Sequence, residues 1–324
     1  MRKDAKTNNH QVIAHVQSYH EGGGYESYAF TGFESNKFFT SDRYVELDDH
    51  FRRADGKPLE GYGLEIEVEC AGINKPAIFA DVLKKIIFVM FPADLFKMQS
   101  DSSLGGSWPH NQRAIGVECI TQVMKKSCIR NHYRDFKAMY DIYFPALNAS
   151  CSVSGRCGMH VNISNACFGK TEEKQKEAIR KLYYFVNKNF AMACTLFKRD
   201  ISHTCYCSQM AHGITIEQAK ERYIGGSNDH GACFNFSHFH VGRIELRLVG
   251  GQSDYWAFRN TMETVFFLVE RMKRIAWKDL DNMEKVFSGC NQYVYKRLKD
   301  CNLSENTMAT IFSNIEYEDL ELHG

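Results

Sequence analysis

Hydrophobic and polar positions alternate most regularly between Gly63 and Glu69, in the sequence GLEIEVE. A period of two predicts a β-strand, because successive side chains of a strand point to opposite faces of the sheet. The apolar side chains of this segment fall on one face and its carboxylates on the other: Leu64, Ile66 and Val68, and Glu65, Glu67 and Glu69. This predicted strand is the reference for the interpretation of the later segments.

A row of like charges on one face of a strand is unfavourable unless cations lie over it. Carboxylate oxygens are hard ligands that suit Mg²⁺ or Mn²⁺, so the row favours a metal site. The alternative is a solvated edge strand, on which charges discourage pairing with other molecules.

Two later segments show the same alternation. In CGMHVNIS, residues 157–164, His160 falls on the polar face of the predicted strand. In GRIELRLVGG, residues 242–251, a carboxylate at Glu245 lies between Arg243 and Arg247 on one face. This triplet fits either a self-contained ion ladder or a metal ligand flanked by guanidinium groups that bind phosphate.

A predicted hairpin places two more carboxylates near each other. Residues 96–100 and 116–121 read as neighbouring strands, with Asp101 and Glu118 at their ends. Asp101 alone also fits an Asx-turn with its own backbone.

Apolar residues at helical spacing predict five helices, at residues 76–87, 127–147, 171–196, 216–223 and 254–277. Strands and helices together predict an α+β fold. We expect an N-terminal extension of irregular or short strands over 1–60, a catalytic domain over 61–277, and a helical segment with an acidic tail over 278–324.

Composition narrows the class of protein. With 40 Lys and Arg against 39 Asp and Glu, the net charge of +1 predicts no nucleic-acid or membrane-surface partner. No apolar run approaches the length of about 18 residues that a membrane span needs, and the N-terminus lacks the apolar core of a secretory signal. We therefore expect a soluble, cytoplasmic protein.

The chain has 12 cysteines without a framework spacing, so we expect reduced thiols. Paired CxxC motifs are absent from the sequence, which makes a structural zinc site a weak alternative. Cys157 and His160 fall on opposite faces of one predicted strand, which argues against a thiol-imidazole nucleophile.

The order of these motifs resembles that of the glutamine synthetase-like carboxylate-amine ligases, most closely the amidoligase family. The similarity covers about residues 60 to 275 and rests on the following motifs: Glu65-x-Glu67, Asp101-x-Ser103, Gly116-x-Glu118, Cys157-Gly-x-His160 and Glu245-x-Arg247. The resemblance implies a curved, mainly antiparallel sheet that carries the active site and is backed by helices. It also implies ATP and Mg²⁺, or Mn²⁺, as cofactors.

The resemblance further implies roles for individual residues. The metal ligands would be Glu65, Glu67, Asp101, Glu118, His160 and Glu245. Arg247 would bind the transferred phosphoryl group. Glu67 and Glu245 would be catalytic residues together with Arg247. Arg199 and Arg222 would contact the nucleotide or the substrate carboxylate, and Glu69 would lie behind the ligands or on the surface.

Two departures from the family pattern stand out. Asn162 occupies a position where relatives commonly have a second histidine, and Ser102-Ser103 replaces a smaller turn. We expect altered specificity rather than inactivity.

The expected activity is formation of an amide or isopeptide bond through an acyl phosphate, with small-molecule or peptide carboxylate and amine substrates. The alternatives are a catalytically silent ligase-like fold that binds nucleotide or protein, and an ATP-dependent transferase that uses the same site.

Overall fold

The fold is taken from a computed structural model of the chain. It describes residues 15–19, 25–29, 37–40, 43–46, 60–71, 83, 96–100, 104, 107–108, 112–121, 123–151, 157–203, 207–225 and 231–316. Three predictions fall outside these residues: the helix over 76–87 apart from the helical Leu83, the position of Asp101, and the acidic tail beyond residue 316.

Ten strands of the described chain form one sheet, and the paired strands in it run antiparallel. Its main path runs β1 (His15–Tyr19), β2 (Tyr25–Ala29), β6 (Phe96–Ser100), β8 (Gln112–Thr121), β5 (Tyr62–Ala71), β10 (Met159–Ser164), β12 (Arg243–Leu246) and β11 (Phe234–Asn235). Two short strands pair beside this path, β7 (Ser107–Trp108) with β8 and β9 (Ala149–Ser150) with β5. β3 (Lys37–Thr40) and β4 (Arg43–Glu46) form a separate hairpin.

The strand of alternating carboxylates, β5, lies inside the sheet with β8 on one side and β10 on the other. The alternative of a solvated edge strand is therefore wrong. Pairing sets Glu67 directly opposite Glu118 of β8, and Glu65 directly opposite His160 of β10. The antiparallel pairing of β6 with β8 confirms the predicted neighbouring strands, but Glu118 lies inside β8 and not at its end.

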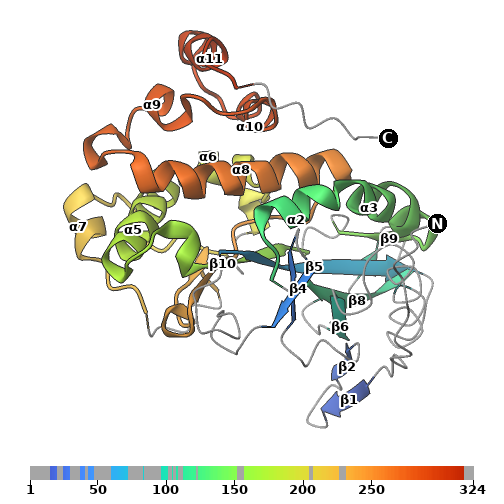
Figure 1. Cartoon of the computed structure of the whole chain (residues 1–324). Helices are drawn as coiled ribbons and strands as arrows, with labels where there is room; N and C mark the ends of the chain where they lie inside the picture. The colour runs from blue at the N-terminus through green and yellow to red at the C-terminus, as the bar shows by residue number, and fades with distance from the viewer. Residues whose placement is uncertain are drawn as a thin grey trace.

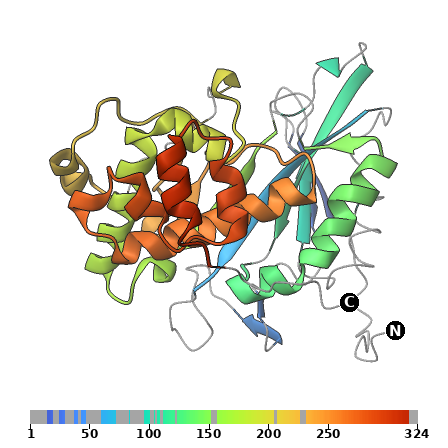
Figure 2. The same cartoon turned by 90° about the horizontal axis from the view of Figure 1, so that it is seen from above.

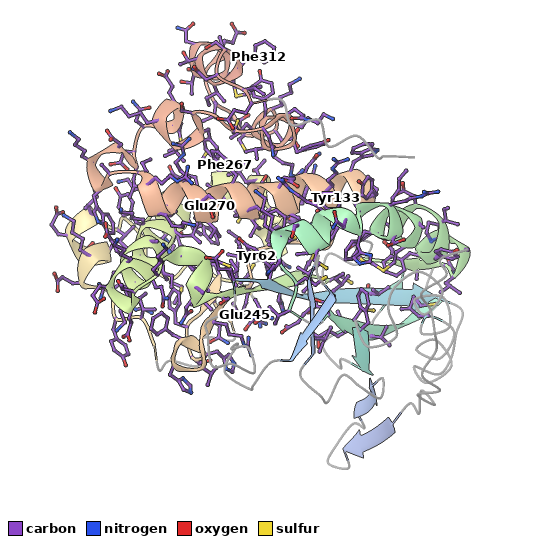
Figure 3. All side chains as sticks on the ribbon, in the orientation of Figure 1. Tyr62, Tyr133, Glu245, Phe267, Glu270 and Phe312 are labelled. Carbon is purple, nitrogen blue, oxygen red and sulfur yellow. The ribbon has the colours of Figure 1, made fainter. Side chains whose placement is uncertain are left out.

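The two faces of β5 meet different surroundings. Tyr62 points toward the helices, since its ring lies 4.7 Å from that of Phe266 in α8 (Tyr255–Arg274), and Leu64, Ile66 and Val68 are fully buried on the same face. The glutamates alternate with these residues and so lie on the other face. Figure 1 shows α8 on one side of the sheet together with α2 (Lys126–Asn131), α3 (Tyr133–Ala138) and α5 (Glu172–Lys188). Figure 3 labels Tyr62 toward α8 and Glu245 on the far side of the strands.

The helices that cover the sheet begin and end close to the predicted positions but are interrupted. The helical bounds are α2 (Lys126–Asn131), α3 (Tyr133–Ala138), a π-helical turn (Met139–Tyr143), α4 (Phe144–Ala146), α5 (Glu172–Lys188), α6 (Phe190–Leu196), α7 (Ile216–Glu221) and α8 (Tyr255–Arg274).

The single helices predicted over 127–147 and 171–196 are each broken. Their interruptions fall at His132, whose ring contacts Asp135 at 2.6 Å, and at Asn189, whose side chain donates to the carbonyl of Phe185 at 3.1 Å. The amide of Asn189 thus competes with the backbone for a helical carbonyl, and apolar periodicity does not register such a bond.

A third layer lies beyond α8. It contains α9 (Met283–Phe287), α10 (Gln292–Leu298) and α11 (Glu305–Phe312), which Figure 2 shows in red over α8 in orange. This sheet backed by helices confirms the predicted α+β class. Among the described helices, none combines the length and the apolar character that spanning a membrane requires.

Candidate metal and phosphate site

Five of the six predicted metal ligands lie together on the face of the sheet opposite α8. They form two groups that share one imidazole, Glu65 with His160 and Glu245, and Glu67 with Glu118 and His160. Within each group the potential ligand atoms lie within 4.8 Å of one another. The sixth predicted ligand, Asp101, lies outside the described residues.

The first group is centred on Nδ1 of His160. This nitrogen lies 3.1 Å from Oε2 of Glu65 and 3.4 Å from Oε1 of Glu245. The second oxygen of Glu245 accepts a hydrogen bond from Nδ2 of Asn235 at 3.0 Å. Both carboxylates therefore keep an oxygen directed at the imidazole.

The second group brings two carboxylates from adjacent strands against the same ring. Nε2 of His160 lies 3.7 Å from Oε1 of Glu67, and the backbone N–H of Gly158 donates to Oε2 of Glu67. Glu67 and Glu118 are both buried and directly opposite in the ladder, where like charges repel. Such an arrangement favours a cation between them.

Charge in the cluster shifts two pKa values in opposite directions. Burial alone would raise the pKa of Glu65, but the hydrogen bond and charge of His160 and the hydrogen bond from Asn162 lower it to about 2. Burial alone would lower the pKa of His160, but the hydrogen bond that its ring donates to Glu65 and the charges of Glu67 and Glu65 raise it to about 9. In the absence of metal, the imidazolium and the Arg247 guanidinium both lie against these carboxylates as cations at neutral pH.

The donor set fits a hard divalent cation. It consists of buried or half-buried carboxylates with one imidazole, held by β5, β8, β10 and β12, and oxygen-rich sets of this kind suit Mg²⁺ or Mn²⁺. A ligand imidazole must be neutral, so metal binding there would release the proton of His160.

Arg247 lies at the edge of the first group. Its Nη1 donates to Oε1 of Glu245, and its side chain keeps 13% of its surface exposed. In the other half of the ion ladder expected as an alternative, Nη1 of Arg243 donates to Oδ1 of Asn162, and the charges of Glu65 and Glu245 also act on the Arg243 guanidinium.

The two other predicted arginines have different surroundings. Arg199 is buried, and its Nη2 donates to the carbonyls of Arg247 at 3.2 Å and Val249 at 2.7 Å. The guanidinium of Arg222 lies 5.4 Å from the ring centre of Tyr183 and 6.0 Å from that of Phe236. Because Asn235 faces the carboxylates, its neighbour Phe236 points to the helical side, and Arg222 stacks there.

Three further predictions can be compared with the structure. Glu69 has no exposed surface, so the suggestion of a surface residue is wrong. The Cys157 thiol is buried, which raises its pKa well above the usual range and opposes a nucleophilic role. All of the described cysteines are free thiols, as expected.

The sequence did not single out Gly158 or Asn235 as site residues. A weak signal for Asn235 is present in Phe234-Asn235-Phe236, where an amide replaces an apolar residue between two phenylalanines. Gly158 is needed for close approach, since an added Cβ would lie 2.7 Å from Nη2 of Arg199 and 3.4 Å from Oε2 of Glu67.

Comparison with known proteins gives a likeness at the level of fold. No family model matches the chain, and no curated protein matches it. Among solved structures, the complex of the prokaryotic ubiquitin-like protein Pup with its ligase PafA aligns with 78% of this chain at a TM-score of 0.33 and 9% identity. The chain spans 61% of the length of that neighbour.

Proposed function

We propose that this protein is an ATP-dependent carboxylate-amine ligase that forms an amide or isopeptide bond through an acyl phosphate. The main support is the meeting of Glu65, Glu67, Glu118, His160 and Glu245 on one rigid face of the sheet. Their arrangement matches what phosphoryl transfer requires, which is positioning and neutralisation of charge.

In the proposed reaction an oxygen of the substrate carboxylate attacks the γ-phosphorus of ATP, and ADP leaves. The amine nitrogen then attacks the acyl carbon, phosphate departs with the electrons of the C–O bond, and the amine gives up one proton. The acid and the amine would be amino acids, peptides or related small molecules.

Each group of residues has a proposed part in this chemistry. The metal ligands would be Glu65, Glu67, Asp101, Glu118, His160 and Glu245, and bound Mg²⁺ or Mn²⁺ would neutralise charge on the phosphate oxygens. Arg247, fixed by Glu245, would present a planar fork of donors to the phosphoryl group. Arg199 would act indirectly, by holding the backbone from which Arg247 projects.

The first test is thermal unfolding of the purified protein with Mg²⁺ alone, ATP alone, and both together. A ligand at 100 times its dissociation constant stabilises the native state by about 2.7 kcal/mol, which is readily measured. We expect Mg²⁺ and ATP together to stabilise the protein more than either ligand alone, and this added stabilisation to vanish in Glu67→Gln, which keeps an acceptor for the Gly158 N–H. Glu221→Gln, an exposed carboxylate at the end of α7, serves as the matched control.

Product analysis then separates the reaction classes. Release of ADP that depends on both an acid and an amine, together with an amide product by mass, supports the ligase. AMP or a phosphorylated product would indicate the transferase. Absence of nucleotide-dependent stabilisation would favour a catalytically silent fold that binds a protein partner.

A further inference from the structure

A chain of two hydrogen bonds runs across the sheet from Arg243 to Glu65. Nη1 of Arg243 on β12 donates to Oδ1 of Asn162 on β10, and Nδ2 of Asn162 donates to Oε1 of Glu65 on β5 at 2.8 Å. The amide of Asn162 therefore lies between a guanidinium and a carboxylate.

The chemistry of these two neighbours fixes the orientation of the amide. A guanidinium carries only donors and an ionised carboxylate carries only acceptors. Turning the amide over would set its NH₂ against Arg243 and its oxygen against Glu65, which are two repulsive contacts. Arg243 thus determines that Asn162 presents a donor to Glu65.

The backbone leaves room for this arrangement. Asn162 lies directly opposite Glu245 in one ladder and opposite Gly63 in the other. Gly63 has no side chain, so the amide of Asn162 reaches diagonally to Glu65, and an added Cβ at position 63 would lie 3.5 Å from Cβ of Asn162. Asn162 is only 6% exposed, so protein groups rather than water orient it.

We propose that Asn162 and Arg243 are positioning residues that hold the Glu65 carboxylate for a divalent cation. With Oε1 of Glu65 bonded to Asn162, Oε2 is left facing Nδ1 of His160 at 3.1 Å, in the group completed by Glu245. This inference rests on the proposed function, because it concerns the same metal site. Loss of a group that orients a metal ligand typically weakens metal affinity 10- to 100-fold.

The test measures the affinity for Mn²⁺ alone, from the electron paramagnetic resonance signal of free Mn²⁺, so that no turnover is needed. We expect Asn162→Ala and Arg243→Ala each to bind Mn²⁺ about 10- to 100-fold more weakly than the wild-type protein. The double variant should bind no more weakly than Asn162→Ala, because both changes break one chain. Arg243→Lys keeps a donor-only side chain and should retain most of the affinity.

Asn165→Ala is the matched control. Asn165 is also 6% exposed, but its Nδ2 donates to the carbonyl of Phe239 at 2.8 Å and not to a carboxylate. This variant should keep the wild-type affinity for Mn²⁺. Its melting temperature without metal measures how much stability is lost when a buried amide is removed. If Asn162→Ala does not fold, Asn162→Leu, which has a similar volume and no amide, replaces it.

The outcomes separate this inference from the proposed function. Wild-type affinity in Asn162→Ala, or losses in the two single variants that add in the double variant, would overturn the positioning role and leave the ligase proposal intact. A wild-type protein that binds no Mn²⁺ would overturn both. Weakened Mn²⁺ binding in the variants, together with a wild-type protein that forms no ADP with any substrate pair, would support the positioning role and contradict the proposed ligase activity.

Discussion

At the scale of single residues, the site depends on a close contact between Gly158 and Arg199. The N–H of Gly158 donates to Glu67, while Arg199 on the other side bonds the carbonyls of Arg247 and Val249. The guanidinium thus connects the start of β10 to the chain that follows β12. The absence of a side chain at position 158 allows both sets of bonds.

We therefore expect Gly158→Ala to destabilise the protein and to disturb Glu67. The added Cβ would lie 2.7 Å from Nη2 of Arg199, a buried group that cannot move without losing its bonds. Overpacking of this kind costs about 1 to 3 kcal/mol, measurable by urea unfolding. Gly63→Ala is the control, because its Cβ would make ordinary contacts of 3.5 Å or more. Equal stability of the two variants would contradict the close-contact argument.

The pKa of His160 predicts how the stability of the metal-free protein changes with pH. The folded value of about 9 lies above the ordinary value of 6.5, so the folded state holds the proton more tightly. The resulting stabilisation is fully present below pH 6.5 and is lost as the pH rises through 9. Urea unfolding in chelator between pH 6 and 9.5 should show this decline.

The decline should be smaller in His160→Gln, which has no proton to lose over this range. His212→Gln removes an exposed imidazole and should keep the wild-type profile. A profile for His160→Gln that parallels the wild type would show that another group causes the decline.

At the scale of secondary-structure elements, a buried polar cluster joins α8 to its neighbours. Glu263 of α8 accepts two hydrogen bonds from Arg130 of α2, at 2.9 and 2.6 Å, and one from the hydroxyl of Tyr133 at 2.7 Å. Nδ2 of Asn291, the N-cap of α10, also donates to this carboxylate, at 3.2 Å. One carboxylate thus connects the helical layer on the sheet with the layer above it.

Removal of this carboxylate should be strongly destabilising. Glu263→Ala leaves the Arg130 guanidinium without its bidentate partner, and breaking a buried pair in this way costs about 3 to 5 kcal/mol. Glu270→Ala, on the same helix but with the partly exposed partner Lys273, should change the free energy of unfolding by less than about 1 kcal/mol. Similar losses in the two variants would argue against the connecting role.

Element types were predictable to different degrees. The period-two segments at 63–69 and 157–164, and the glutamate and arginine alternation around Glu245, fall within or overlap β5, β10 and β12. Local side-chain periodicity determines these strands, so the sequence contains the information. The break at Asn189 coincides with a hydrogen bond from its side chain to a helical carbonyl, which periodicity does not record.

At the scale of the whole molecule, the site exists only because the sheet brings distant segments side by side. The strand order β8, β5, β10, β12 places Glu118, Glu67, His160 and Glu245 on adjacent strands. The family resemblance named these ligands, and the alternating pattern placed Glu67, His160 and Glu245 on predicted strands. The sequence did not predict the contacts of Asn162 with Arg243 or of Asn235 with Glu245. These contacts depend on how the separate strands pair in the sheet.

The sharing of His160 between two groups of ligands leads to a prediction for the whole site. If both groups hold a cation, the wild-type protein should bind two Mn²⁺ ions. His160→Ala should lower the affinity for both ions, since His160 supplies a ligand atom to each group. Glu118→Gln should lower the affinity for one ion and leave the affinity for the other unchanged. Glu245→Gln should have the opposite effect, because each carboxylate belongs to a single group. Equilibrium dialysis with Mn²⁺ measures the stoichiometry and both affinities. A single ion that is lost equally in all three variants would show that the two groups form one site around His160.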